Sequence, residues 1–277
     1  MIQSSIVKRL LVALWGIPLL LWATYRGGLA FELLIGGISL LGLAEYYKLQ
    51  EGLGLKPLKY TGFGSGLAVI IAWAMGGGGV VWVMAGAFLF ASIITTLQVR
   101  SHKDIVATFA GIAYIPFLVG TFLFIRLGHF AGSEYLVDGK WVALCIWGAI
   151  WMTDSAAYGG GKAFGKHRIA PDISPKKTLE GFIFGFLGAM LFVVVLYYLG
   201  KISLDVALAV GIGAGVFGQI GDLIESKLKR DANVKDAGEK LPGHGGILDR
   251  FDSLLVTAPA VALYLVVKYN FLNGSGH

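Results

Sequence analysis

The sequence predicts an all-α integral membrane protein, a polytopic bundle of about nine transmembrane helices. Of its 277 residues, 56% are hydrophobic and 14% are charged, whereas roughly a quarter of a soluble globular protein is charged. Apolar runs repeatedly reach the roughly 20 residues that a spanning helix needs. These runs are continuous, which argues against a membrane β-barrel, whose strands alternate in hydrophobicity over about 10 residues.

The expected spans follow one another along the chain with mostly short connections. The first lies in an N-terminal segment in which basic residues precede an apolar run, as in a signal peptide. No A-x-A-like cleavage site follows this run, so we expect a helix that is retained in the protein. The second and third are glycine-rich, and Glu32 and Glu45 interrupt the apolar pattern of the second. The 41 glycines favour close helix packing in lipid. The expected spans are 9–25, 28–46, 62–78, 80–98, 105–126, 141–159, 179–200, 203–221 and 249–270.

The distribution of basic residues predicts the orientation of the chain. With the N-terminus on the cytoplasmic side, cytoplasmic segments hold most of the 23 Lys and Arg residues, as the positive-inside rule requires. This predicts a cytoplasmic N-terminus, an external C-terminus and an odd number of spans. The basic excess is then a topology signal, which argues against nucleic-acid binding. The five basic residues that fall outside the cytoplasmic segments are Arg26, Arg126, Lys140, Lys201 and Lys268.

Two long polar loops, 160–178 and 222–248, fall on the cytoplasmic side in this topology. Because the other connections are mostly short, these loops are where chemistry can be housed. We therefore divide the chain into an N-terminal multispan region, 1–140, and a C-terminal catalytic region, 141–277, that carries both loops.

The second loop mixes both signs of charge. Between Asp222 and Asp252 the chain has six basic and seven acidic residues. A segment that only docks on anionic lipid is expected to carry charges of one sign, namely positive. The mixture favours a site that holds both anions and cations.

Three acids of this loop are candidates for a metal site. Asp249 and Asp252 lie three residues apart at the start of the last span, so they share one helical face. Asp222 ends the preceding span at the same expected depth. Converging carboxylates repel one another unless a cation neutralises them, and hard oxygen ligands suit Mg²⁺. The alternative is that Asp249 and Asp252 cap the helix N-terminus, where acids are favourable.

The motif GHGG precedes the last span, at residues 243–246. Glycines let backbone N–H groups approach an anion, and a helix N-terminus favours phosphate. His244 is then a phosphate donor, an acid or a base. The alternatives are a plain glycine turn and a hydrogen-bonded loop histidine. No HExxH or CxxC motif accompanies it, and Cys145 is the one cysteine, which argues against zinc and against a disulfide framework.

The first loop carries a near match to a phosphate-binding P-loop, at Gly160 to Lys166. His167 replaces the required Ser or Thr, and a membrane helix precedes the motif instead of a strand, which excludes that assignment. Thr178 and Glu180 open a span and favour helix initiation. The loop's cations could bind a triphosphate or a lipid phosphate, or reflect topology alone, and Asp154 adds a carboxylate near the end of its own span. These cations are Lys162, Lys166, Arg168, Lys176 and Lys177.

The stretch 226–252, SKLKRDANVKDAGEKLPGHGGILDRFD, resembles the signature of the phosphatidate cytidylyltransferases (CDP-diacylglycerol synthases). The upstream SPKKTLEG and DSAAYGGGKAFGK resemble the same family, so the likeness covers roughly residues 150–255. The N-terminal half agrees in being multispan. The matching positions are Ser226, Lys229, Arg230, Lys235, Asp236, Gly238, Pro242, His244, Gly245, Gly246, Asp249, Arg250 and Asp252.

The resemblance implies a reaction in phospholipid biosynthesis in which CTP and phosphatidic acid give CDP-diacylglycerol and pyrophosphate. It implies a nucleotidyltransferase dependent on Mg²⁺, alone or with a second cation, and a homodimer. The enzyme is expected in the cell (inner or cytoplasmic) membrane, with its active site on the cytoplasmic face and acyl chains entering sideways between helices.

The resemblance also implies roles for individual residues. The expected metal ligands are Asp222, Asp249 and Asp252. The expected catalytic residues are Lys229, Arg230, Lys235, Asp236, His244 and Arg250. The expected substrate-binding residues, for the nucleotide phosphates and the lipid headgroup, are Ser174, Lys176, Lys177, Thr178, Ser226, Gly245 and Gly246.

Two other function classes compete with this assignment. Intramembrane carboxylates also mark the ion pathways of transporters and channels, although those sites usually lie near the midplane and often in inverted repeats. Another lipid nucleotidyl- or phosphotransferase is the second class. The CDP-alcohol transferase pattern is absent, since residues 221–230 read GDLIESKLKR.

Overall fold

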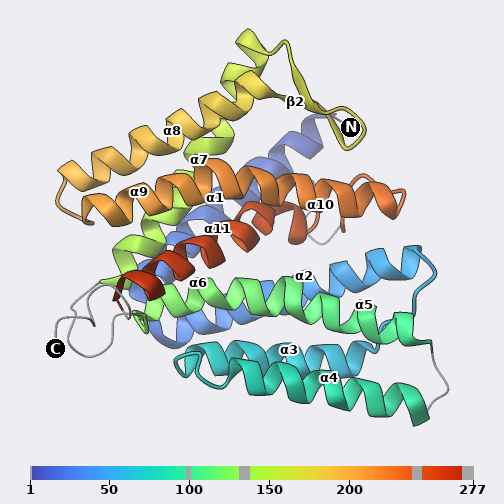
Figure 1. Ribbon diagram of the computed structural model, residues 1–277. Helices are drawn as coiled ribbons and strands as arrows, with labels where there is room; N and C mark the ends of the chain where they lie inside the picture. Colours follow the sequence, from blue (N-terminus) through green and yellow to red (C-terminus); the bar gives the residue numbers. More distant parts are fainter. Residues whose placement is uncertain (1, 98–100, 131–137, 239–244, 270–277) are drawn as a thin grey trace. The chain divides into compact units, whose positions relative to one another are not determined.

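The structure is a computed structural model that describes residues 2–97, 101–130, 138–238 and 245–269, with the side chains of the first helix described from Leu14 onward (Figure 1). Two helical stretches contain a π-helical segment, η1 or η2, that joins two α-helices. The helices are α1 (Ile2–Arg26), α2 (Gly28–Gly52), α3 (Lys59–Ala74), α4 (Val80–Leu97), α5 (His102–Ile112), η1 (Ala113–Phe117), α6 (Leu118–Leu127), α7 (Gly139–Phe164), α8 (Leu179–Tyr198), α9 (Leu204–Ile212), η2 (Gly213–Gly218), α10 (Gln219–Asp231) and α11 (Leu248–Val267).

Five helical stretches in the described part of the chain are long and apolar enough to cross a membrane. Helices also underlie the other expected spans. The prediction of an all-α membrane protein is confirmed at this level, while the count of nine crossings and the orientation stay predictions. The five stretches are Gly28–Gly52, His102–Leu127, Leu179–Tyr198, Leu204–Asp231 and Leu248–Val267.

The helix that carries Asp222 runs further than the sequence pattern predicts. We expected the span to end near residue 221, but α9, η2 and α10 continue without a break to Asp231. Leu, Glu, Lys and Arg are good helix formers, and α10 is amphipathic, so its charges lie along a helix and not in a loop. Asn233 ends it with φ 55°, and Val234 N–H and Asn233 N–H donate to the carbonyls of Lys229 and Arg230, which is a Schellman cap.

The chain divides into two compact units. Unit 1 comprises Met1–Phe124 and Leu228–Phe251, and unit 2 comprises Ile125–Lys227 and Asp252–His277. The functional division at residue 140 stays a prediction.

Unit 1 is organised around Tyr47 of α2, which is fully buried. Its hydroxyl donates to the Thr108 carbonyl oxygen of α5 at 2.9 Å. Gly111 of α5 faces its ring, and a Cβ there would lie 2.6 Å from Tyr47 Cε1. Phe31 and Phe122 pack edge to face, with centroids 5.6 Å apart, and extend this core. The segment that begins with Leu228 belongs to the same unit.

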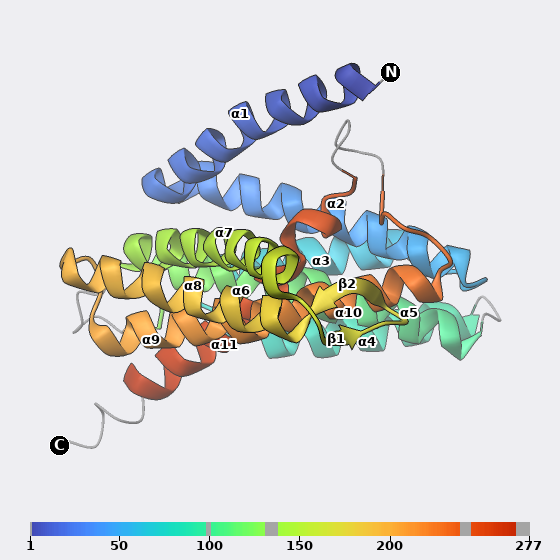
Figure 2. The same cartoon turned by 90° about the horizontal axis from the view of Figure 1, so that it is seen from above.

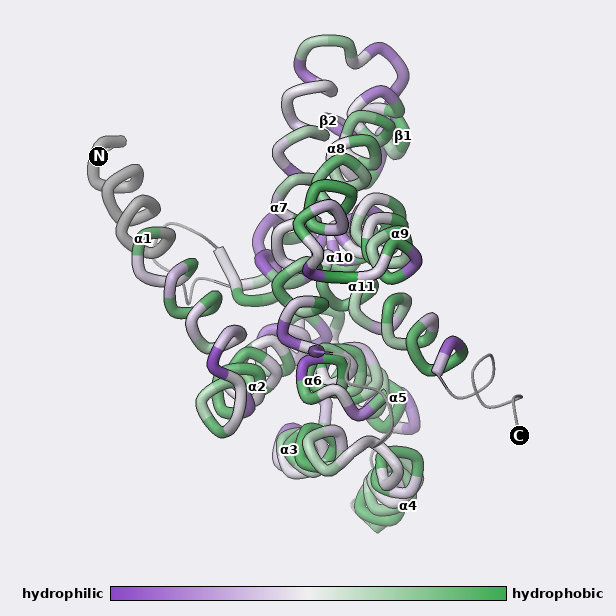
Figure 3. Tube along the Cα trace, turned by 90° about the vertical axis from the view of Figure 1, so that its left-hand side faces the viewer, coloured by the Kyte–Doolittle hydropathy of each residue, from purple (hydrophilic) through white to green (hydrophobic). Residues whose placement is uncertain are grey.

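Unit 2 is built on α7 and α8, which pack closely along their length, with α9 beside α8 (Figures 1 and 2). Small residues allow the approach: a Cβ at Gly188 would lie 2.6 Å from Ala156 Cβ, and one at Gly185 would lie 3.1 Å from Ala157 Cβ. The outer helices α8 and α9 are mostly hydrophobic along their length (Figure 3).

The loop between α7 and α8 forms a small hairpin that the sequence analysis did not predict. Strands β1 (Arg168–Ala170) and β2 (Ser174–Thr178) pair antiparallel, with Arg168 opposite Thr178 and Ala170 opposite Ser174. Pro175 is compatible with an edge strand, and proline is disfavoured in a helix interior. The expectation of helices and loops alone was therefore wrong for this segment.

Candidate active site

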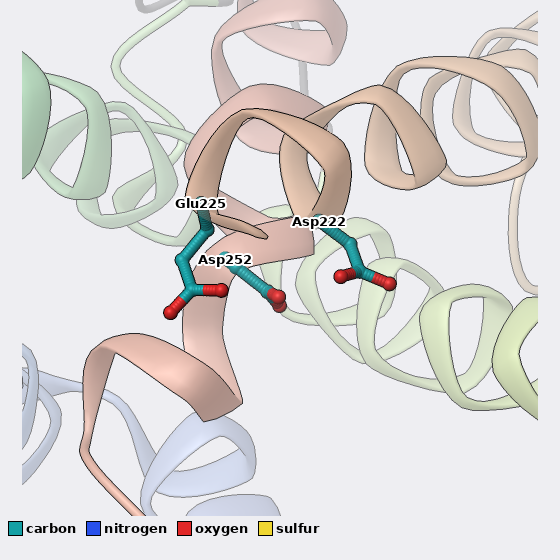
Figure 4. A group of neighbouring side chains, drawn as sticks. All are labelled: Asp222, Glu225 and Asp252. Carbon is teal, nitrogen blue, oxygen red and sulfur yellow. The ribbon is translucent and has the colours of Figure 1, made fainter. Parts of the chain in front are cut away.

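Three carboxylates converge in unit 2. Asp222 and Glu225 lie three residues apart on α10, and Asp252 comes from α11. Each can offer one oxygen so that the three oxygens lie within 4.8 Å of one another (Figure 4). Figure 4 shows Asp252 between the other two. This spacing lets one cation contact all three side chains.

Glycines bring α10 and α11 close enough for this convergence. A Cβ at Gly221 would lie 2.6 Å from the Asp252 carbonyl oxygen, and one at Gly218 would lie 2.9 Å from Thr257 Oγ1. Only glycine permits backbones to approach so closely. Gly218 ends the π-helical segment η2, and such segments frequently occur at functional sites.

Charged groups of both signs lie around the cluster. Lys177 Nζ lies 2.7 Å from Asp222 Oδ2. The Asp252 carboxylate is attracted by Lys177 and repelled by Asp222 and Asp154, and Ser253 N–H donates to its Oδ1 at 2.7 Å. Converging carboxylates repel one another unless a cation or a proton neutralises them. The donor set, all hard oxygens, fits a divalent cation such as Mg²⁺.

The hairpin brings Lys177 to the cluster. Thr178 is the N-cap of α8, and its hydroxyl oxygen accepts from Gly181 N–H at 3.2 Å. Glu180 Oε2 accepts from the backbone N–H groups of Lys166 and His167 at 3.0 and 3.2 Å. The expectation that Thr178 and Glu180 initiate a helix is confirmed. These contacts fix both ends of the hairpin.

The remaining predicted residues of unit 2 lie on helix α10 and strand β2. Ser226 Oγ of α10 donates to Asp222 Oδ1 at 3.4 Å. Ser174 and Lys176 lie on β2 with Lys177, where Lys176 is exposed and Ser174 is partly buried. The structure therefore brings Lys177, Ser226 and the acids Asp222 and Asp252 together.

In unit 1, Asp249 lies in a dense network. Lys229 Nζ donates to Asp249 Oδ1 at 2.6 Å, and both side chains are largely buried. The N–H groups of Ala237 and Gly246 donate to Asp249 Oδ2 at 3.0 and 2.8 Å. Gly245 has φ +79° in the turn before α11, a conformation that glycine adopts without strain. Asp249 therefore braces the turn through donors that lie outside α11; both its assignment to the metal and the capping alternative stay predictions.

The other predicted residues of unit 1 are exposed. Arg230 donates through Nη1 to the Val234 carbonyl oxygen at 3.1 Å. Lys235, Asp236 and Arg250 are exposed. His244 lies outside the described residues.

Glu225 is the site residue that the sequence analysis missed. It was counted among the acids of residues 222–252, but it was not assigned to the metal. The available signal was its spacing of three from Asp222, which equals the spacing of Asp249 and Asp252. That signal depends on a helix that continues past residue 221, which was not expected.

Comparison with known proteins gives a consistent result. Residues 7–268 match the cytidylyltransferase family. The phosphatidate cytidylyltransferase of Synechocystis sp. (strain ATCC 27184 / PCC 6803 / Kazusa) is 32% identical over 289 residues, which cover 96% of this chain and 98% of the relative. Enzymes of the same name from Staphylococcus haemolyticus (strain JCSC1435) and Staphylococcus aureus (strain COL) are 32% and 31% identical, each covering 93% of this chain and 98% of the relative.

Proposed function

The chain belongs to the cytidylyltransferase family, and from this premise we propose that it is a membrane enzyme that transfers CMP from CTP to phosphatidic acid. The products are CDP-diacylglycerol and pyrophosphate, and the pathway is phospholipid biosynthesis. The observation that carries the proposal is the match over residues 7–268, together with full-length relatives that bear this activity in their names.

The reaction joins two anions. A phosphate oxygen of phosphatidic acid forms a bond to the α-phosphorus of CTP, while the bond from that phosphorus to the β-phosphate oxygen breaks and pyrophosphate leaves. Such transfers need positioning and charge stabilisation more than covalent catalysis. The mixture of acids and bases between Asp222 and Asp252 suits this requirement.

Asp222, Glu225 and Asp252 would hold the Mg²⁺ of the reaction, which would offset charge on the leaving pyrophosphate when bound. The three oxygens within 4.8 Å support this assignment. Lys177 forms an ion pair with Asp222 at 2.7 Å and exchanges this carboxylate for a phosphate group when substrate binds. Asp249 remains a further candidate ligand, alone or at a second cation.

The bases of the second signature segment contact phosphates. Lys229 is already oriented by Asp249 at 2.6 Å. The other residues proposed to bind the nucleotide phosphates are Arg230, Lys235, His244, Gly245, Gly246 and Arg250, with Asp236 and Ser226 beside them. Hairpin residues Ser174, Lys176, Lys177 and Thr178 bind the phosphatidate headgroup.

The finer cellular assignments follow from family membership and charge distribution. We propose nine spans, a cytoplasmic N-terminus and an active site on the cytoplasmic face of the cell membrane. The positive-inside distribution supports the orientation. We also propose a homodimer, which cross-linking of the purified protein in lipid can test.

The test is a turnover assay with purified protein, labelled CTP, phosphatidic acid and Mg²⁺. Asp222→Ala and Asp252→Ala are each expected to reduce turnover by about 100-fold or more, as loss of a key electrostatic group does. Glu51→Ala is the control, because Glu51 is an exposed carboxylate paired with Lys59. No CDP-diacylglycerol from the wild type refutes the function. Near-wild-type turnover in both alanine variants refutes the metal assignment alone.

A further inference from the structure

Glu45 is a buried carboxylate that the proposed reaction does not use. It lies on α2, inside the candidate span Gly28–Gly52, and is 2% exposed. A carboxylate in such a segment is costly, so it usually faces a partner or a functional site. The sequence analysis noted Glu45 only as an interruption of an apolar run.

The partner of Glu45 is the first residue of α11. Leu248 N–H donates to Glu45 Oε2 at 2.9 Å, across 203 positions of the chain. The first N–H groups of a helix have no acceptor within that helix, and the side chain of the preceding residue usually provides one. Here that residue is Ile247, which has no side-chain acceptor. Glu45 therefore caps α11 from a distant helix, with its negative charge at the positive end of the α11 dipole.

Two glycines of the signature segment fit around this carboxylate. A Cβ at Gly238 would lie 2.6 Å from Glu45 Oε1, 2.8 Å from Cδ and 3.1 Å from Cγ. A Cβ at Gly246 would meet Glu45 Oε2 first. Neither glycine has a positive φ. Close contact therefore favours glycine at both positions: with Glu45 at Gly238, and with Glu45 and the Gly238 backbone nitrogen at Gly246.

The carboxylate lies next to groups of the proposed active site. Gly246 N–H, beside Glu45, donates to Asp249 Oδ2 at 2.8 Å, and Asp249 in turn holds Lys229. Leu248, which Glu45 caps, directly precedes Asp249. Among the described residues, Glu45 Oε1 has no hydrogen-bond partner, so the side chain is held by the cap and by packing.

We propose that Glu45 is a positioning residue for the reaction: it caps α11 and holds the turn 245–248, so that Asp249 and Lys229 keep their orientation. This inference rests on the proposed function for its catalytic consequence. The structural part, the cap and the fit to two glycines, can be measured without any turnover.

The first experiment measures amide hydrogen exchange in the wild type, Glu45→Ala, Glu45→Gln and the control Glu51→Ala. In Glu45→Ala, loss of the acceptor is expected to speed exchange at residues 245–251 by about tenfold or more, the equivalent of one buried donor left unpaired. Glu45→Gln keeps an oxygen acceptor and is expected to stay closer to the wild type. Exchange in α8 and in the control is expected to be unchanged. Unchanged exchange at 245–251 in Glu45→Ala, or equal acceleration throughout the protein, overturns the proposal.

The second experiment tests the fit to Gly238. Gly238→Ala is expected to displace the carboxylate, to speed exchange at 245–251 and to lower kcat while raising the KM for CTP. In Glu45→Ala/Gly238→Ala the collision is absent, so the effects of the two changes are expected to be less than additive. Gly64→Ala is the control, because no atom lies within 4 Å of a Cβ there.

The outcomes separate the positioning role from the function itself. If Glu45→Ala cannot be purified in a folded form, Gly238→Ala alone decides, because it removes no group. Wild-type exchange and kinetics in Gly238→Ala, or strictly additive effects in the double variant, overturn the positioning role. Absence of turnover in the wild type refutes the proposed function, while the exchange data still decide on the cap.

Discussion

Asp252→Asn is expected to stabilise the metal-free protein against unfolding and to remove its response to Mg²⁺. At a separation of at most 4.8 Å between their nearest oxygens and an effective dielectric constant of about 20, two carboxylates repel by about 3 kcal/mol when both are ionised. Asp252 takes part in two of the three pairs with Asp222 and Glu225. Lys177 offsets part of this repulsion and water screens Asp222, so we expect a net gain of about 1–3 kcal/mol.

The assay is thermal unfolding of the purified protein in EDTA and through a Mg²⁺ titration. A cation that binds only the folded state stabilises it by about 2.7 kcal/mol at a concentration 100-fold above its Kd. The wild type is therefore expected to melt higher with Mg²⁺, and Asp252→Asn is expected to melt higher in EDTA but to gain little from the ion. Glu51→Gln, which changes an exposed carboxylate, serves as the control.

One result refutes this reasoning. If Asp252→Asn melts lower than the wild type in EDTA and still gains the full shift from Mg²⁺, the acids do not share a cation. Asp252 then serves the helix start, as the capping alternative requires.

Three further changes have defined outcomes. Lys229→Met removes the buried ammonium that pairs with the Asp249 carboxylate at 2.6 Å, and we expect a loss of about 3 kcal/mol in chemical denaturation. Gly221→Ala places a Cβ 2.6 Å from the Asp252 carbonyl oxygen, so we expect about 1–3 kcal/mol of destabilisation and weaker Mn²⁺ binding by electron paramagnetic resonance. Lys177→Met frees a carboxylate, so Mn²⁺ is expected to bind more tightly while turnover falls.

Matched variants control these measurements. Lys227→Met changes an exposed lysine on the same helix as Lys229, and Gly64→Ala adds a methyl group in open space. A loss in Lys227→Met as large as that in Lys229→Met contradicts the buried pair. Unchanged Mn²⁺ affinity in both Gly221→Ala and Lys177→Met contradicts the assigned surroundings of the acid cluster.

The helices could be predicted because continuous apolar runs of spanning length leave few alternatives. Helix ends were harder. Charged residues after residue 221 suggested a loop, yet α10 continues to Asp231 because its residues favour helix and one of its faces is buried. The hairpin at 168–178 was missed because its strands are short and do not alternate clearly.

The site could be predicted as a set of residues but not as a geometry. The signature, the upstream loop and the position of Asp222 at the end of a span pointed to Asp252, Lys177 and Asp222, but nothing in the spacing indicated that Lys177 pairs with Asp222 across 45 positions. Glu225 could be assigned to the cluster only if α10 was known to continue past residue 221. Glu45 could not be assigned, because its partner, Leu248, donates through a backbone group that carries no sequence signal.

The most direct test of the central proposal follows the phosphorus atoms of CTP. Purified wild-type protein with phosphatidic acid and Mg²⁺ receives CTP labelled at either the α- or the γ-phosphate. CMP transfer predicts that the α label enters the lipid product and that the γ label leaves in pyrophosphate, in equal amounts. A γ label in the lipid, or loss of CTP without a labelled lipid, contradicts CMP transfer to phosphatidic acid.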